Sequence, residues 1–271
     1  MKKHYLLLSS AFVLSMLSFV SCTKEDIVAA TDNSPVVAAA SIDLVNELDI
    51  KTGQEISFNK LTAKQSGKSA AVCYTTTDVS TANFPKTYTI DFGTGCTLNG
   101  ITRKGVLKIT FTDVVTAAGS TMKIERKDYY VNGNKVEGTI TYENKTVSSD
   151  APQWTRTVAD GKYTDLKGDV YSNSGTFTVK QTAGASTTII TDDTYEMISG
   201  NHTVSKQNGA KITLTVAESL VKKFDCDYIS KGKLNVESTL LKGQIDFGNV
   251  NDCDTKATFT SNGIAFPIEM K

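Results

Sequence analysis

The chain has 271 residues, of which 39% are hydrophobic and 21% are charged, with 29 basic and 29 acidic side chains. This length and hydrophobic content suit a globular domain with a sizeable core. Because the charges balance, there is no basic excess for a phosphate backbone, so we expect no nucleic-acid partner.

The first segment has the pattern of an export signal. Lys2 and Lys3 give a positive start, and a 15-residue apolar stretch follows from Leu6 to Val20. This stretch is short for a membrane-spanning helix, although an uncleaved anchor helix is the alternative. Residues 1–21 are therefore predicted to be a signal peptide.

The end of this segment carries a lipidation motif. Phe19-Val20-Ser21-Cys22 resembles the lipobox of bacterial lipoproteins, with Phe19 where leucine is usual. The resemblance implies cleavage before Cys22 and acylation of Cys22, which would hold the chain on a membrane outside the cytoplasm. Cleavage would remove two lysines and leave 250 residues with 27 basic and 29 acidic side chains, a net charge of −2.

The residues after Cys22 indicate on which membrane and on which side of it the protein is expected to lie. Thr23-Lys24-Glu25-Asp26 resembles the surface-export signal of Bacteroidota lipoproteins, and a solvated linker is the alternative. We therefore expect a lipid-anchored protein of the outer membrane, exposed at the cell surface, with a periplasm-facing position as the other possibility.

A helix is predicted after a flexible tether over residues 22–34. Ser34 suits an N-cap and Pro35 a first helical position, and Gly53 follows the end of the pattern. Five residues at helical spacing share one side: Val37, Ser41, Leu44, Val45 and Leu48. We expect a helix over 35–53 that covers an edge or an open end of the following sheet.

From about residue 54 the hydrophobic period changes from 3.6 to 2. Apolar residues alternate with Thr, Lys, Glu or Asn over 107–112, 136–143, 211–216 and 233–237. Threonine, which occurs 37 times, suits the solvated face of a strand. The alternation predicts antiparallel strands with one face in water.

Short turn signals separate these runs. Asn132-Gly133-Asn134 reads as a hairpin turn, and similar signals recur at 160–161, 173–175, 208–209 and 262–263. Short connections favour a meander, and a dozen or more strands rarely remain in one flat open sheet. The predicted fold class is all-β, an antiparallel meander forming a sandwich or a closed or half-open barrel, with one N-terminal helix. Residues 54–271 are expected to form a single domain, and two sub-domains meeting near 147–154 are the alternative.

Four cysteines besides Cys22 predict two disulfides, because an even count is typical of exported chains. Three connectivities are possible. A weak internal repeat selects one, since each half has a cysteine, then Ile-Asp-Phe-Gly (90–93 and 245–248), then a second cysteine. We predict Cys73–Cys96 and Cys226–Cys253, and four reduced buried thiols are the alternative.

The same motifs carry a family resemblance. Ile90-Asp91-Phe92-Gly93-Thr94-Gly95-Cys96, followed by Arg103-Lys104-Gly105, resembles a motif of uncharacterised lipoproteins of Bacteroidota. Ile245-Asp246-Phe247-Gly248 with Asp252-Cys253-Asp254 resembles the C-terminal end of that family. The resemblance implies a lipid-anchored, β-rich chain and brings no activity with it.

Two Asp-Cys-Asp motifs form the candidate metal site. In a strand, the aspartates that flank a cysteine share the face opposite it. If the two cysteines are bridged, four carboxylates gather into a weak Ca²⁺ site: Asp225, Asp227, Asp252 and Asp254. The preferred interpretation is an acidic solvated face neutralised by Lys222, Lys223 and Lys256, with no resident metal.

Few residues suggest catalysis. His202 is the only histidine left after cleavage, no Gly-x-Ser-x-Gly context is present, and we expect a solvated turn histidine. Asp192-Asp193 with Glu196 are acids of the type used by glycosidases, although sequence spacing gives no separation in space. Trp154 is expected to pack within the sheet, and an exposed sugar platform is the alternative.

The sequence therefore predicts a non-catalytic envelope or surface lipoprotein, a binding or structural module without a cofactor. Its expected partners are the membrane, through lipidated Cys22, and an envelope protein or a glycan. One alternative is a lipid or lipoprotein carrier with an apolar cavity lined by Leu107, Ile109, Phe111 and Ile140. A glycan hydrolase is the third hypothesis.

Overall fold

The computed structural model describes residues 32–61, 73–79, 83–147, 151–207, 209–249 and 253–270. The predicted signal peptide, Cys22, most of the predicted tether and Asp252 lie outside the described residues. The described residues of 32–271 form one compact unit, and β6 pairs directly with β7 across the expected sub-domain boundary. The alternative of two sub-domains is therefore wrong.

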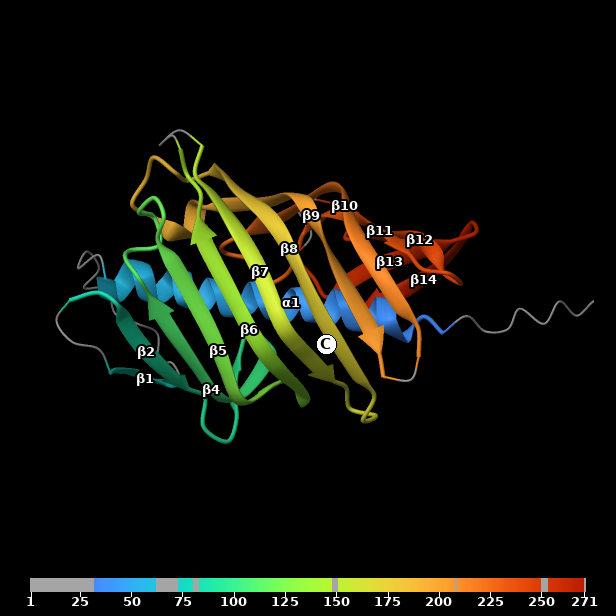
Figure 1. Ribbon diagram of the computed structural model, residues 1–271, viewed down its shortest axis with the longest axis horizontal. Helices are drawn as coiled ribbons and strands as arrows, with labels where there is room; N and C mark the ends of the chain where they lie inside the picture. The colour runs from blue at the N-terminus through green and yellow to red at the C-terminus, as the bar shows by residue number, and fades with distance from the viewer. Residues whose placement is uncertain are drawn as a thin grey trace, which may run out of the picture. The chain divides into compact units, whose positions relative to one another are not determined.

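Helix α1 precedes a long succession of strands (Figure 1). It spans Ser34–Ile56, and a short π-helical segment, Ser57–Leu61, continues it. The strands of the first half are β1 (Thr75–Asp78), β2 (Lys86–Asp91), β3 (Cys96–Leu98), β4 (Ile101–Phe111), β5 (Thr121–Val131), β6 (Asn134–Asn144) and β7 (Gln153–Thr164). Those of the second half are β8 (Val170–Ala183), β9 (Thr194–Lys206), β10 (Lys211–Lys223), β11 (Lys231–Glu237), β12 (Lys242–Asp246), β13 (Lys256–Ser261) and β14 (Ile264–Glu269), with a 3₁₀ turn at Ile190–Asp192 before β9.

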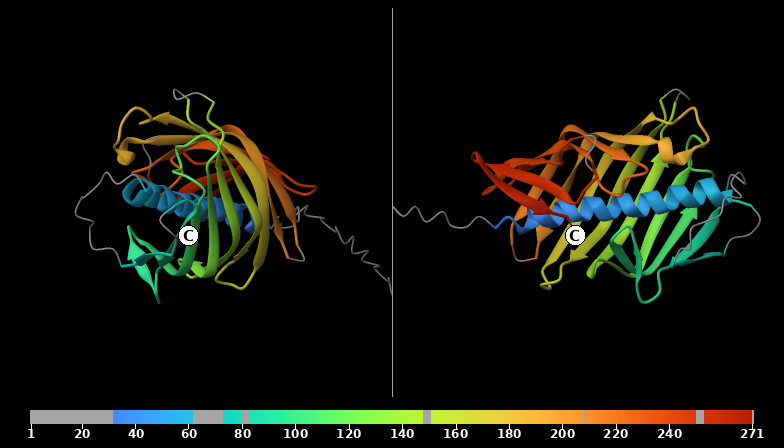
Figure 2. Two further views of the ribbon diagram at one scale, coloured as in Figure 1. Left: turned by 60° about the vertical axis from the view of Figure 1, so that its left-hand side comes forward. Right: turned by 180° about the vertical axis from the view of Figure 1, so that it is seen from behind.

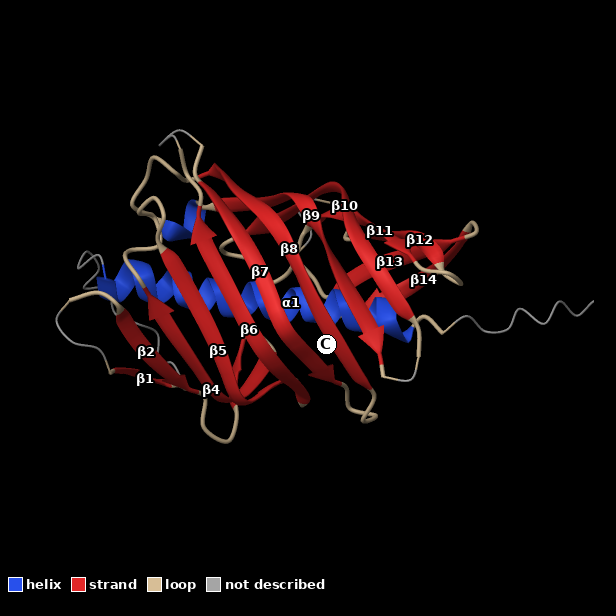
Figure 3. Cartoon of the chain, in the orientation of Figure 1, coloured by secondary structure: helices blue, strands red, loops and turns tan. Residues whose placement is uncertain are grey.

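Within the described residues, the strands form a single antiparallel sheet of 14 strands. Figure 3 shows these strands in red around the blue helix. Neighbours in the sheet follow sequence order from β1 to β14, except that β3 pairs only with β4. The predicted meander is confirmed, because each short connection returns the chain beside the strand it has just left. Edge strands β1 and β14 do not meet, so the sheet is half-open.

Helix α1 lies along the concave face of this curled sheet (Figure 2). It is buried on nearly all sides, and Val37, at 38%, is its most exposed large apolar residue. The expectation that the helix covers an edge or open end is therefore wrong. It is the core around which the sheet folds, because the inward faces of so many strands need one apolar partner. It also begins after Asn33 rather than Ser34 and extends to Ile56, beyond the expected end at 53.

Irregularities in the sheet explain how it curls. The register shifts in each pairing from β4–β5 to β10–β11, and such bulges bend and twist strands. Gly138 has φ +100°, and a Cβ there would lie 2.6 Å from the Cα of Gly161 on the next strand. Only glycine permits so close an approach.

Two predicted turns belong to this bent region instead. Asp160-Gly161 lies inside β7 and Asn173-Ser174-Gly175 lies inside β8, where Gly161 and Asn173 are cross-strand partners. The signals at 132–134 and 262–263 do form hairpin turns, with positive φ at Asn132, Gly133, Asn262 and Gly263. Of the predicted signal at 208–209, only Gly209 lies within the described residues.

Candidate functional site

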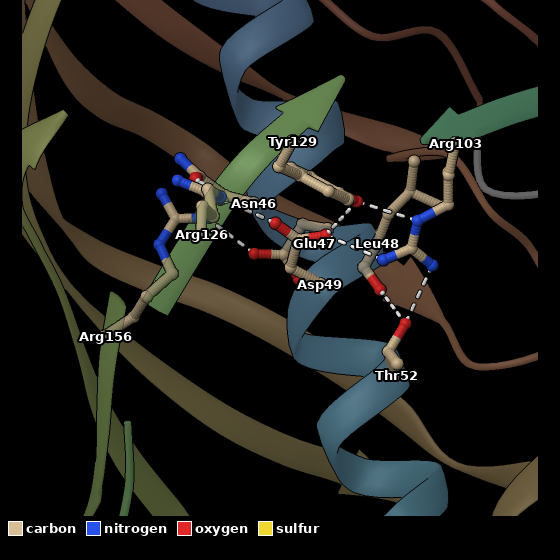
Figure 4. A network of polar contacts seen from close by, with 9 residues as sticks. All are labelled: Asn46, Glu47, Leu48, Asp49, Thr52, Arg103, Arg126, Tyr129 and Arg156. Carbon is tan, nitrogen blue, oxygen red and sulfur yellow. Dashed lines mark hydrogen bonds and ion pairs between the residues drawn. The ribbon is translucent and has the colours of Figure 1, made fainter. Parts of the chain in front are cut away.

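A buried polar cluster lies between the middle of α1 and the sheet (Figure 4). Asp49 is fully buried and accepts hydrogen bonds from Arg103 Nη2 at 2.8 Å, Arg126 Nε at 2.8 Å and Tyr129 Oη at 2.6 Å. Arg103 also donates to Thr52 Oγ1 at 2.9 Å. Burial raises the pKa of Tyr129, so its hydroxyl remains a donor to Asp49.

A second buried cluster involves Asp43 and Glu47, six and two residues before Asp49 on the helix. Arg156 on β7 donates to Glu47 Oε1 at 2.6 Å and to Asp43 Oδ1 at 3.1 Å, and all three side chains are at most 9% exposed. Its guanidinium lies 4.4 Å from the ring centre of Phe177. Buried charges persist only when they are paired in this way, so these groups hold the helix in register with the sheet.

His202 belongs to this second cluster, so the expected solvated turn histidine is wrong. It lies within β9, is 4% exposed, and its Nε2 is 3.5 Å from Asp43 Oδ2. Burial lowers the pKa of His202; the carboxylate of Asp43 opposes this shift and the positive Arg156 adds to it, and the net effect is a lowered pKa. The ring is therefore neutral at neutral pH and packs edge-on against Phe177.

Both predicted disulfides are present, Cys73–Cys96 and Cys226–Cys253. The alternative of reduced thiols is wrong. Cys73 and Cys96 join the start of β1 to β3, and Cys226 and Cys253 join the loops after β10 and β12. The internal repeat selected the correct connectivity because each cysteine pair encloses one Ile-Asp-Phe-Gly strand end.

The acidic residues beside the second disulfide are dispersed. Asp227 accepts from Lys51 Nζ at 2.6 Å and from Asn99 Nδ2 at 2.8 Å, while Asp254 accepts from the backbone of Lys256. Asp225 is exposed, and Asp252 lies outside the described residues. Among the residues whose positions are described, no group of three His, Cys, Asp or Glu side chains is arranged to hold a metal ion.

Of the lysines expected to neutralise these acids, Lys222 lies near enough to Asp225 and Asp227 to attract them, but it forms no ion pair with either. The ion pair of Asp227 is made by Lys51 on the helix. Lys222 is 4% exposed, and its ammonium donates to the carbonyl oxygens of Lys223 and Cys226. Burial lowers the pKa of Lys222 to about 8, with Lys51 adding repulsion. Lys222 thus secures the turn that carries the second disulfide.

The remaining site candidates pack within the core. Trp154 is 1% exposed, stacks on Tyr142 at 5.6 Å, and donates from Nε1 to the carbonyl oxygen of Val115 at 3.0 Å. An exposed sugar platform at Trp154 is therefore wrong. Asp193 is buried and accepts from Tyr195 Oη at 2.7 Å, whereas Asp192 is exposed and bonded to Thr187.

The apolar hollow expected for a carrier is filled. Leu107, Ile109, Phe111 and Ile140 are completely buried in the core cluster that also contains the apolar residues of α1. They belong to a filled core and do not line an open cavity, and the helix occupies the space inside the curl of the sheet (Figure 2). A carrier would need a different cavity.

A pocket of about 370 Å³ opens where α1 begins, and we call it the helix-start pocket. It lies between the first turns of α1, the hairpins β5–β6 and β7–β8, and the end of β14. Val37 and Leu166 are its exposed apolar residues, at 38% and 70%. The full lining is Asn33, Ser34, Val37, Ala38, Ser41, Asn134, Tyr163, Asp165, Leu166, Lys167, Tyr171 and Glu269.

Polar groups converge on this pocket as well. Asn33 Oδ1 is buried and has no hydrogen-bond partner within the described structure. Lys206 supports one wall, with Nζ 2.9 Å from Asp169 and 3.4 Å from Asp32, and it lies 5.9 Å from the ring centre of Tyr171. The volume and the mixed lining fit a small-molecule site of ordinary size.

Sequence reasoning missed the buried arginines and the helix-start pocket. A signal for two arginines exists, since Arg126 follows Met122 and Ile124, and Arg156 lies between Trp154 and Val158, all at the inward positions of their strands. A charge in an inward position implies a buried partner. The pocket has no such signal, because its lining comes from four separate segments.

Within the described residues, no helix has both the length and the apolar character needed to cross a membrane. No family model, curated protein or solved structure matches this chain.

Proposed function

We propose that this chain is a non-catalytic lipoprotein of the bacterial envelope, anchored through Cys22, that binds a small ligand in the helix-start pocket. The anchor is supported by the lipobox-like Phe19-Val20-Ser21-Cys22 after a short apolar run. The observation that carries the binding role is the pocket itself, a preformed cavity of about 370 Å³. The family resemblance supports an outer-membrane, surface-exposed address.

The non-catalytic part of the proposal is supported by where the acid–base groups lie. Asp43, Glu47 and His202 face one another and Arg156 inside the core, where substrate has no access. Asp49 is equally enclosed between two arginines. Buried charges that are paired with arginines stabilise a fold, and burial keeps these carboxylates and the imidazole away from a substrate.

The lining of the pocket narrows the class of ligand. Asn33 Oδ1 has no hydrogen-bond partner among the described residues. The charged residues of the lining are Asp165, Glu269 and Lys167, while Lys206 in the adjoining wall is already paired with Asp169 and Asp32. An anionic ligand is disfavoured by this charge balance. Val37 and Leu166 offer apolar contact. We infer a neutral ligand with hydroxyl donors and an apolar face, the chemistry of a neutral sugar.

A lipid carrier is the second candidate, favoured by the apolar side chains of Val37 and Leu166 at the same pocket. In that case the ligand would be an acyl chain in the helix-start pocket, not in the filled interior of the sheet. The two candidates differ in whether the bound molecule carries hydroxyl donors for Asn33.

The anchor is tested by metabolic labelling with a palmitate analogue. The wild-type chain should incorporate the label and sediment with membranes, and Cys22→Ser should do neither. An unlabelled wild-type chain that remains in the cytoplasm would overturn the address.

The ligand site is tested with a panel of neutral oligosaccharides, sulfated oligosaccharides and phospholipids, using saturation-transfer NMR. Val37→Trp fills the pocket, whereas Ile198→Trp places the same bulk on β9; the two original side chains are equally exposed at 38%. We expect a neutral sugar to bind wild type and Ile198→Trp but not Val37→Trp. Phospholipid binding lost in Val37→Trp would select the carrier, and unchanged binding in Val37→Trp would place the site elsewhere.

A further inference from the structure

The start of α1 lies beside one edge of the sheet, which we call the helix-start edge. In an antiparallel meander, alternate turns fall at the same edge, so the turns after β5, β7, β9, β11 and β13 share it. The helix begins here, because Asn33 and Ser34 lie beside the β5–β6 and β7–β8 hairpins. Figures 1 and 2 show the start of α1 and the β13–β14 hairpin at the same end of the sheet.

Large apolar side chains are exposed at this edge. Leu166 in the turn after β7 is 70% exposed, Leu240 in the turn after β11 is 85% exposed, and Ile264 beside the turn after β13 is 56% exposed. The pairing of Gln244 with Thr260 places the last two turns next to each other in the sheet. Leu240 and Ile264 therefore belong to one apolar tip, to which Phe266, 36% exposed, also belongs.

The apolar tip lies on a face that is covered elsewhere. Ile264 pairs with Ser261 and Phe266 pairs with Phe259, so these side chains share the concave face with the buried ring of Phe259. Further along β14, Ile268 is 3% exposed on the same face. The apolar face thus continues from the core to Ile264, where it becomes exposed and some other surface is needed to cover it.

The length of the chain before α1 indicates which surface that is. Nine residues lie between Cys22 and Asp32, and the ten residue steps from one to the other span at most about 36 Å when extended. Ile264 is five residues along β14 from Glu269, which lines the pocket beside Ser34, a distance of about 17 Å. An acylated Cys22 would therefore keep the apolar tip within reach of the bilayer that holds the acyl chains.

We propose that the apolar tip formed by Leu240, Ile264 and Phe266 inserts into the interface of the lipid bilayer that carries the anchor, and so orients the protein on the membrane. This inference rests on the proposed anchor at Cys22. The partner is the lipid surface itself, reached by apolar side chains on two hairpins. Neighbouring charges are mixed, with Lys242 near Glu237, so insertion depends on apolar burial and not on lipid charge.

The first experiment measures how deeply a tryptophan side chain enters the bilayer. It uses the lipidated mature protein on phosphatidylcholine vesicles that carry brominated acyl chains. Ile264→Trp reports on the apolar tip, and Ile189→Trp reports on the opposite edge from a nearly equal exposure of 54%. The signal of buried Trp154 is subtracted using wild type. We expect strong bromine quenching for Ile264→Trp and none for Ile189→Trp. Equal quenching of the two variants would overturn the proposal.

The second experiment removes the anchor. The mature chain with Cys22→Ser should still partition weakly onto phosphatidylcholine vesicles, equally at low and high salt. Leu240→Ser and Ile264→Ser should each weaken this partitioning about tenfold, and Ile189→Ser should not. If partitioning onto vesicles persists but palmitate labelling fails, the anchor at Cys22 is wrong and membrane insertion of the apolar tip still holds. If labelling succeeds but neither partitioning nor quenching is observed, insertion of the apolar tip is wrong and the anchor at Cys22 still holds.

A second copy of the chain is the competing occupant of the tip. Sedimentation of the Cys22→Ser chain should show a monomer over the concentrations used with vesicles. A dimer that Ile264→Ser dissociates would overturn the proposal by assigning the apolar tip to contact between copies.

Discussion

Replacing Asp49 with asparagine should destabilise this protein more than any exposed charge change. The substitution keeps the size of the side chain and removes its negative charge. Arg126, whose side chain is 1% exposed, and Arg103 would then face each other across a neutral amide. Tyr129, which donates to Asp49 Oδ1 at 2.6 Å, would also lose its charged acceptor.

The magnitude follows from the burial of the partners. Breaking a buried ion pair by removing one member costs about 3–5 kcal/mol, because the other charge remains in the interior without compensation. Asp49 serves two arginines, so the upper part of this range is expected. A typical domain is stable by only about 5–15 kcal/mol, so the variant should lie near the threshold of folding.

The assay is urea unfolding of the mature chain, followed by far-ultraviolet circular dichroism at neutral pH. The control is Glu125→Ala. It removes a carboxylate of 37% exposure together with its ion pairs to Lys123 and Lys108, which are also exposed. That control should cost at most about 1 kcal/mol. If Asp49→Asn lowers the free energy of unfolding no more than Glu125→Ala does, the buried cluster does not stabilise the fold.

Three further predictions concern other features of the fold. Burial lowers the pKa of His202, so the unfolded chain binds a proton more readily than the folded one, and the free energy of unfolding should fall as the pH drops below about 6.5. Unfolding curves measured at successive pH values should show a weaker pH dependence for His202→Gln. The double variant Cys226→Ser/Cys253→Ser opens a loop with a sequence separation of 27 and should cost roughly 3–4 kcal/mol in the chain-entropy model, as measured by urea midpoint. Gly105→Ala places a Cβ 1.9 Å from the carbonyl oxygen of Asp128, whereas Gly119→Ala at similar φ meets nothing within 4 Å, so melting temperature should drop much further in the first variant.

The strands could be predicted from the sequence because their signal is local. Leu107, Ile109 and Phe111 alternate with polar residues, and each is completely buried. The hairpin at Asn132-Gly133 was equally readable, since both residues adopt the positive φ that the turn requires. Asp160-Gly161 carries the same signal but forms part of a bulge, because a bend between two long strands needs the same backbone freedom as a turn.

The environment of the helix could not be predicted in the same way. The spacing of Val37, Leu44 and Leu48 indicates one apolar side, yet Asp43 and Asp49 are also buried. Their burial depends on arginines that lie between 54 and 113 residues later in the chain. Local periodicity contains no information on such partners, so an enclosed helix looked like a surface helix.

His202 shows the same limitation on the strand side. Its neighbours Gly200 and Asn201 resemble a turn, but β9 continues through them, and the ring faces Asp43 on the helix. The helix-start pocket could not be predicted from any local sequence pattern, because its residues come from the helix, two hairpins and the last strand.

Intact-mass spectrometry of the full-length protein purified from the native envelope tests the central claim most directly. We expect a chain that begins at Cys22 and carries the added mass of acyl chains. A chain that retains residues 1–21, or one that begins at another residue and carries no lipid, would contradict lipidation at Cys22. It would also contradict the orientation that we propose for the apolar tip on the membrane.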